Sequence, residues 1–358
     1  MEASLKLALV HDYLNQMGGA ERAVEVLLET FPQAPLYTSI YLSQNMPQIY
    51  QKKDIRTSFM QRLPFLNRHF KKYLLLYPYA FESFNLKGYE VVLSSSSAWA
   101  KGVRISPDTC HICYCYTPMR WVWNYDEYVR RENFGWLIRK ALPLAIRRLE
   151  KWDRKTTDRV DHYIAISKNV AKRIKKLYHR EATVIYPPVR TDNFFISPEV
   201  EDYYLIVSRL NSYKRIDLAI EVFNALKKPL KIIGDGPHRP VLEKMAARNV
   251  EFLGRLSDEK IAQYYARCQA LIFPGEEDFG IAPVEAQASG RPVIAYGKGG
   301  ALETVIDGQT GLFFYEQTFE SLKKVIKNFE RLSFDPQLIR KKAQRFDKAI
   351  FMRKTKDF

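Results

Sequence analysis

The sequence has little cysteine and no long apolar run, and both absences narrow the class of protein. Four cysteines among 358 residues are too few for the disulfide framework of a secreted domain, which agrees with a reducing compartment. No stretch reaches the ~20 apolar residues of a membrane-spanning helix. Residues 1–10 have too short an apolar run for a signal peptide. We therefore expect a cytoplasmic protein that is at most peripheral to a membrane, at the inner face of the cell membrane.

The sequence also lacks nucleic-acid-binding signatures, although it is strongly basic. The formal net charge is +16, and residues 101–190 hold 20 Lys and Arg against 9 Asp and Glu. No helix-turn-helix, zinc-finger or RNA-binding pattern accompanies this charge. In residues 64–77 and 134–152 the basic residues stand beside Trp, Phe and Leu, as in helices that lie on an anionic membrane. The alternative is a core-facing stripe with a solvated opposite face. We expect an anionic membrane surface as a partner, and no nucleic acid.

Metal-binding patterns are scarce as well. The sequence contains no Asp-x-Asp pair. Cys110, His111, Cys113 and Cys115 lie close together, but this segment reads as a buried strand, whose side chains point alternately to opposite faces. No second Cys/His pair lies nearby. We expect a core or strand-edge role for His111 and no metal or other cofactor.

Short apolar strands alternate with helical stretches along the whole chain, which predicts parallel sheets covered by helices on both faces. Two prolines and a polar, acidic stretch after residue 186 separate two halves of this kind. We expect two Rossmann-like, doubly wound α/β domains, residues 1–188 and 189–337, and a basic helical tail. The expected strands are 5–10, 91–94, 110–116, 162–167, 184–189, 203–208, 230–234, 250–254, 270–274 and 292–295.

One segment, residues 274–290, combines a strand end, a glycine and a helix start. The helix is expected to open near Ile281, with Pro283 in its first turn. Its free amide hydrogens and positive dipole end suit a diphosphate, and Gly280 lets the backbone approach closely. Glu277 and Glu285 are placed to accept hydrogen bonds from sugar and ribose hydroxyls, respectively. Alone, two acids near a helix start would be ordinary.

The surrounding motifs carry a family resemblance. The two glutamates followed by Gly-Arg-Pro-Val-Ile-Ala at 290–295, the segment 208–219, and the loops at 234–237, 252–255, 299–303 and 18–22 occur in the order typical of one family. In these motifs the chain resembles glycosyltransferase family 4, retaining enzymes of the GT-B fold. The resemblance implies two domains that face each other across a cleft, with the donor nucleotide held mainly by the second domain. It also implies that the C-terminal helix, residues 338–358, returns to the first domain.

The resemblance implies roles for individual residues, which physical chemistry supports. Arg209 and Lys214 correspond to the cations that grip the donor diphosphate, one as a planar fork and one as a mobile charge. Together with Glu277 they form the expected catalytic set. The donor-binding residues expected beside them are Gly18, Gly19, Gly234, Arg255, Phe279, Gly280, Ile281, Ala282 and Glu285. A plain tight turn before a helix is the alternative for the two N-terminal glycines.

The segment from 110 to 125 resembles a subgroup of mannosyltransferases of O-antigen and exopolysaccharide assembly. That subgroup commonly has a histidine where this chain has Tyr116. Tyr116 either contacts the sugar or the phosphate, or packs. Arg120 is a further candidate for donor or acceptor contact.

The function expected from these features is retaining transfer of a hexose, mannose from GDP-mannose, onto a lipid-linked or polysaccharide acceptor at the membrane. A UDP-sugar donor and a catalytically inactive sugar-nucleotide-binding protein are the alternatives. An epimerase or a phosphorylase could share the fold, but their acid/base pair and cofactor lysine are not evident in the sequence.

Overall fold

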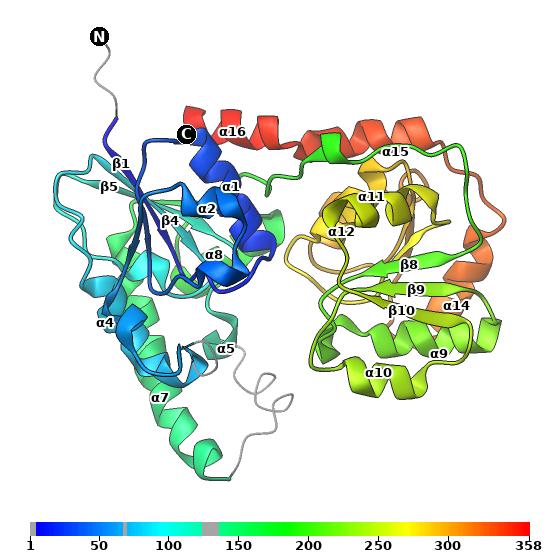
Figure 1. Cartoon of the computed structure of the whole chain (residues 1–358), viewed down its shortest axis with the longest axis horizontal. Helices are drawn as coiled ribbons and strands as arrows, with labels where there is room; N and C mark the ends of the chain where they lie inside the picture. The colour runs from blue at the N-terminus through cyan, green and yellow to red at the C-terminus, as the bar shows by residue number, and fades with distance from the viewer. Residues whose placement is uncertain (1–4, 67–69, 124–135) are drawn as a thin grey trace. The chain divides into compact units, whose positions relative to one another are not determined.

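The computed structural model describes residues 5–66, 70–123 and 136–358. The chain divides into two compact units (Figure 1). Unit 1 comprises Met1–Tyr186 and Lys354–Phe358, and unit 2 comprises Pro187–Arg353. The change of unit therefore comes two residues before the expected position at 188. No helix within the described residues has both the length and the hydrophobicity that a membrane crossing requires.

Unit 1 contains a seven-stranded sheet in which every neighbouring pair is parallel. The strand order is β3-β2-β1-β4-β5-β6-β7. The chain adds strands on one side of β1 as far as β3 and then continues on the other side with β4, so the order of the strands, but not their direction, reverses between β1 and β4. Several predicted strands are confirmed, whereas the three-residue strands β2 and β3 were not predicted. The strands are β1 Leu7–His11, β2 Leu36–Thr38, β3 Ile55–Thr57, β4 Val91–Ser96, β5 Cys110–Cys115, β6 His162–Ala165 and β7 Ala182–Val184.

The strand that was expected to end at the two prolines, residues 187 and 188, ends earlier. β7 ends at Val184, before the prolines, because proline lacks the amide hydrogen that a sheet ladder needs. The helices of unit 1 lie in the segments between these strands. They are α1 Gly19–Thr30, α2 Gln48–Gln51, α4 Tyr77–Glu82, α5 Arg120–Trp123, α7 Trp136–Lys155 and α8 Lys168–Tyr178.

The core of unit 1 is rich in aromatic rings and contains one buried ion pair. Tyr77 stacks on Trp99 with ring centroids 5.0 Å apart, and Trp99 meets Trp152 at 5.7 Å. Lys101 Nζ lies 3.0 Å from Asp153 Oδ1, and both side chains are buried. The Lys101 ammonium also donates to Thr156 Oγ1 at 2.7 Å. These contacts join the end of β4 to α7 inside the unit.

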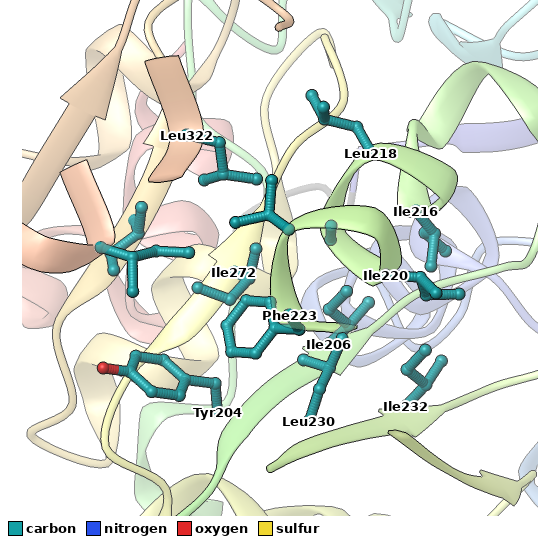
Figure 2. Close-up of a cluster of buried hydrophobic side chains, with 14 of the residues drawn as sticks. Tyr204, Ile206, Ile216, Leu218, Ile220, Phe223, Leu230, Ile232, Ile272 and Leu322 are labelled. Atoms are coloured by element: carbon teal, nitrogen blue, oxygen red, sulfur yellow. The ribbon is translucent and has the colours of Figure 1, made fainter. Parts of the chain in front are cut away.

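Unit 2 contains a six-stranded parallel sheet in the order β10-β9-β8-β11-β12-β13, which reverses between β8 and β11. In Figure 1, α9 and α10 lie on one side of this sheet and α11 and α12 on the other. Figure 2 shows side chains of α9 packed onto the strands, with Phe223 beside Tyr204 and Ile272. The strands are β8 Tyr204–Val207, β9 Leu230–Ile233, β10 Val250–Gly254, β11 Leu271–Phe273, β12 Val293–Tyr296 and β13 Gly311–Phe314. The helices are α9 Ile216–Leu226, α10 Arg239–Met245, α11 Asp258–Arg267, α12 Ile281–Ala288, α13 Ala301–Thr304, α14 Phe319–Phe329 and α15 Pro336–Ala343.

The C-terminal tail is not one helix. α15 packs on α12, and Arg340 Nη1 donates to the carbonyls of Phe194 and Ala288. After a short 3-10 turn, α16 runs over Lys348–Asp357. Residues 338–358 were expected to belong to the first domain. In the structure residues 338–353 belong to unit 2, and only Lys354–Phe358 belong to unit 1. The reason is that Ile339 and its neighbours on α15 are buried in unit 2.

Candidate functional site

The predicted donor-binding residues of unit 2 gather where the strand order reverses. Arg209 and Lys214 lie in the connection that follows β8, and Glu277 lies in the loop that follows β11. Ligands of open parallel sheets bind at the carboxyl ends of the strands beside such a reversal. The sequence motifs, more than 60 residues apart along the chain, are thus brought to one edge of one sheet.

Lys214 and Glu277 form an ion pair between the ammonium and Oε1 of the carboxylate. Their side chains are 13% and 23% exposed, so the pair is half-buried and accessible to a ligand. Two backbone features bring the loops together. Arg215 adopts a left-handed φ of 53° directly after Lys214. At Gly275, an added Cβ would lie 2.9 Å from Lys214 Cα, so only glycine permits this approach without a shift.

Helix α12 begins directly after the Glu277 loop. Its N-cap is Gly280, at φ 90°, and no side chain caps the helix. The first turn contains no acid, and Ile281 and Ala282 are half-buried. An N-terminus of this kind presents amide hydrogens and a positive dipole end to an anion. Phe279 is buried and its ring meets that of Phe346 at 5.3 Å, so a ligand can contact only its backbone.

Gly299 and Gly300 pack directly against the backbone of the Glu277 loop. The Gly300 amide donates to the Glu277 carbonyl at 2.8 Å. A Cβ on Gly299 would overlap the same carbonyl, and one on Gly300 would overlap the backbone of Phe279. The position of Glu277 is therefore set by main-chain packing.

Glu285 lies on α12, half-buried, four residues after Ile281. Its Oε2 accepts a hydrogen bond from Tyr265 Oη at 3.0 Å. This contact orients the carboxylate. The ribose contact of Glu285 stays a prediction, and the role of Tyr265 had no signal in the sequence.

The loops that follow β9 and β10 carry the remaining donor-side residues of unit 2. Gly234 has a φ of 128°, and a Cβ there would overlap the Ser208 carbonyl. Arg255 is 82% exposed, and its Nε lies 3.8 Å from Asp235 Oδ2. These two residues lie on the β8 side of the strand reversal, so the predicted donor residues of unit 2 occupy adjacent loops of one sheet edge.

In unit 1, Tyr116 connects the strand edge to the glycine loop. Its hydroxyl donates to the Ala20 carbonyl at 3.0 Å and lies 2.9 Å from Ser95 Oγ. Burial raises the pKa of this phenol. Tyr116 thus packs against the first turn of α1, and its contact with a sugar or phosphate stays a prediction. Gly18 is the N-cap of α1 with an extended backbone at φ −155°, and Gly19 is the first residue of the helix.

Asp12 is a residue of this edge that sequence reasoning missed. Its Oδ2 accepts the amides of Ser97 and Ala98 at 2.7 and 3.0 Å. Its Oδ1 accepts those of Trp99 and Ala100 at 2.8 and 2.7 Å. One carboxylate thus fixes the loop after β4, beside the strand reversal of unit 1. The only sequence signal is an acid directly after β1.

His111 is a core histidine, as expected. Its Nδ1 donates to the Arg159 carbonyl at 2.8 Å, which leaves Nε2 to accept from Ser94 Oγ at 2.8 Å. Burial lowers its pKa to about 4. Across the residues that the structure describes, no group of three or more His, Cys, Asp and Glu is arranged to hold a metal.

Arg120 is half-buried at the start of α5, where it lines a pocket with residues of α8. Residues 124 and 125 of the motif that contains it lie outside the described part of the chain.

Two family profiles match the chain in succession. The profile of Glycosyltransferase Family 4 matches residues 17–193, and that of Glycosyl transferases group 1 matches residues 189–350. Together they cover every strand of both sheets except β1 and include every predicted site residue.

The sequence identity between this chain and individual relatives is modest. An uncharacterised glycosyltransferase of Methanocaldococcus jannaschii is 30% identical over 175 residues, which is 48% of this chain and 50% of that protein. The O-antigen chain mannosyltransferase RfbU of Salmonella typhimurium is 28% identical over 58% of this chain and 57% of its own length. The alpha-1,3/1,6-mannosyltransferase ALG2 of Dictyostelium discoideum is 24% identical over 87% and 86%. The match thus spans only about half of the first two relatives.

Solved structures share the fold over the full length. HepE of Anabaena in complex with UDP has a TM-score of 0.73 at 17% identity, with 99% of each chain covered. Sucrose-phosphate synthase of Thermosynechococcus elongatus has a TM-score of 0.76 at 18% identity, covering 99% and 98%. From the two profiles, the two parallel sheets and these neighbours, we conclude that the chain belongs to glycosyltransferase family 4 and has the GT-B fold.

Proposed function

We propose that this glycosyltransferase moves mannose from GDP-mannose, with retention of anomeric configuration, onto a lipid-linked or polysaccharide acceptor. The observation that carries the proposal is the Lys214–Glu277 pair at the strand reversal of unit 2, directly before the uncapped α12. A sugar diphosphate presents an anion to the lysine and the helix end, and hydroxyls to the glutamate.

The chemistry follows from these charges. When the bond between the sugar C1 and the diphosphate oxygen breaks, its electron pair stays on the diphosphate. In this proposal Arg209, Lys214 and the amide end of α12 stabilise that added charge, and electrostatic stabilisation of this kind is the largest single contribution to catalysis in many enzymes. The acceptor hydroxyl forms the new bond to C1 on the same face, and its proton passes to the leaving diphosphate. In this proposal no metal cofactor is required, because fixed cations and a helix end take its role.

The choice of mannose rests on relatives. Mannosyltransferases from a bacterium and a slime mould are among the proteins to which the chain is similar. A UDP-sugar is the second candidate donor, because HepE, which shares the fold, was solved with UDP.

We further propose that unit 1 rests on the inner face of the cell membrane. Large apolar side chains are exposed next to basic ones around α4 and α7: Leu75, Tyr79 and Leu144 are each at least 45% exposed. Arg148, from α7, donates to Tyr79 Oη at 2.7 Å, which places the two helices together. Such a surface suits the boundary between lipid headgroups and acyl chains. Residues 67–69 and 134–135 of the predicted interfacial segments lie outside the described chain.

Two adjacent glutamates offer a matched test. Glu277→Gln removes the half-buried partner of Lys214, whereas Glu276→Gln removes an exposed partner that lies 3.9 Å from Lys298. We expect Glu277→Gln to lower kcat by about 10²–10³-fold, the usual cost of one lost electrostatic group. Glu276→Gln should stay within about twofold, since exposed pairs contribute little.

The assay is release of free nucleotide from GDP-mannose and from UDP-sugars, with membrane extract as the source of acceptor. Release only from uridine donors would overturn the mannose assignment. Binding of a sugar nucleotide without release under any condition would show the inactive alternative. Equal rates for the two glutamine variants would remove Glu277 from the site.

A further inference from the structure

Unit 1 contains a basic pocket that the proposed donor chemistry does not use. The pocket has a volume of about 270 Å³, close to the lower end of small-molecule sites. Its walls come from the segment after β5 and from one face of α8. The lining residues are Pro118, Arg120, Trp123, Asn169, Lys172, Arg173, Lys176 and Leu177.

The charge of this lining has one sign. Four of its eight residues are Lys or Arg, and none is acidic. On α8 the basic residues Lys172, Arg173 and Lys176 recur at the three- and four-residue spacing that puts side chains on one helix face. Val170 and Ile174 of the same helix are buried in the core, so the basic face is separate from the packed face. A ligand for this pocket must carry negative charge.

The pocket is held in shape by contacts in its wall. Arg173 Nη1 donates to Thr117 Oγ1 at 2.8 Å, which ties α8 to the turn after β5. Trp123 Nε1 donates to Asp153 Oδ2 at 2.8 Å, and the Arg154 guanidinium lies 4.4 Å from the ring centroid of Trp123. Because Thr117 already holds the guanidinium of Arg173, this side chain loses less conformational freedom when it binds an anion. Its planar set of donors also matches the oxygens of a phosphate.

The pocket also has an apolar part and lies at a favourable edge of the sheet. Pro118, Trp123 and Leu177 provide surface for a non-polar portion of the ligand. The segment that begins after β5, and α8, which begins after β6, both start at the carboxyl ends of parallel strands. This is the edge at which α/β sheets bind ligands. A ligand that combines phosphate with apolar or sugar groups fits both parts.

We propose that this pocket binds the phosphate or diphosphate group of the acceptor, with Lys172, Arg173, Lys176 and Arg120 as its ligands. The assignment of the ligand as the acceptor rests on the proposed function, whereas the anion site is inferred from the lining residues alone. The acceptor is then a sugar or lipid linked through phosphate, rather than a neutral polysaccharide end.

The test compares two sets of lysines on one helix. Lys172→Gln combined with Lys176→Gln removes two charges from the lining. Lys175→Gln is the matched control, because Lys175 lies on the same helix, outside the lining, and pairs with Glu181. Binding of inorganic diphosphate and of a short prenyl diphosphate is measured by calorimetry at fixed ionic strength. Hydrogen exchange of residues 117–123 and 168–178 locates the bound anion in unit 1.

We expect both probes to protect these segments in the wild type. The double variant should bind them at least about tenfold more weakly, since each lost charge-assisted hydrogen bond costs roughly a factor of ten. The control should stay within about twofold. Equal affinities of the double variant and the control for the two probes would overturn the proposal that this pocket binds phosphate. Absence of protection from both segments would overturn it as well.

A second arm separates the sources of phosphate. Vesicles of anionic phospholipid are titrated in parallel with the prenyl diphosphate. Protection of the two segments by vesicles alone would assign the pocket to a bilayer headgroup and overturn the acceptor role. Nucleotide release is measured separately: its absence, with diphosphate still bound at α8, would defeat the proposed function and leave the anion site standing.

Discussion

The carboxylate of Asp12 gives a prediction whose magnitude follows from counted hydrogen bonds. Each of its oxygens accepts two backbone amides from the loop after β4, at 2.7–3.0 Å, and the side chain is 2% exposed. In Asp12→Asn, one oxygen becomes an NH₂ group, which cannot accept. Two buried amides then face a donor and lose their partners. At about 1–3 kcal/mol for each unsatisfied buried group, unit 1 should lose about 2–6 kcal/mol of unfolding free energy.

The matched control is Asp54→Asn, because Asp54 forms an exposed ion pair with Arg56 in the same unit. That variant should lose less than about 1 kcal/mol. Urea denaturation gives the free energies, and hydrogen exchange of residues 91–103 reports the loop directly, since two units need not unfold as one. Similar losses for the two variants, or an unchanged loop exchange rate in Asp12→Asn, would refute the assigned role of the carboxylate.

Two further predictions concern other parts of the molecule. In Gly300→Ala the new methyl group would overlap a neighbouring backbone and shift the Glu277 loop, so turnover should fall about 10²-fold. Gly308 has a φ of 70°, but an added Cβ there would meet no atom within 4 Å, so Gly308→Ala should leave turnover unchanged; equal turnover in both variants would disprove the packing argument. The lowered pKa of His111, about 4, means that acid protonates the unfolded state first: stability falls by at most about 3 kcal/mol between pH 6.5 and 4. His111→Gln should lack this part of the pH dependence in urea titrations, and an unchanged slope would contradict it.

The doubly wound parallel sheets and most strands could be predicted from the sequence, because apolar strand segments alternate with helical ones along the chain. Val91–Ser96 and Cys110–Cys115 are six-residue strands with buried centres, and both were predicted. The three-residue strand Leu36–Thr38 and the strand Gly311–Phe314 were missed. A short strand is defined by its neighbours in the sheet, and this information is not local.

The functional site, too, could be predicted from the sequence only in part. The helix start at Gly280 was readable, because a strand end, a glycine and a helical pattern follow one another along the chain. The pairing of Lys214 with Glu277 depends on which strands are adjacent, and only the family resemblance suggested that both belong to one site. Asp12 binds amides 85–88 residues away, a relation that no spacing rule contains.

The contacts of Gly275, Gly299 and Gly300 have an evolutionary consequence. Because backbone packs directly on backbone there, the path of the Glu277 loop is independent of the size and polarity of most side chains around it. Exposed positions on other loops of the same sheet edge, such as Arg255, are therefore free to change without disturbing the anion-binding end of α12. A lineage with this architecture can acquire a new donor preference by exchanging surface side chains while the phosphate-binding backbone stays the same.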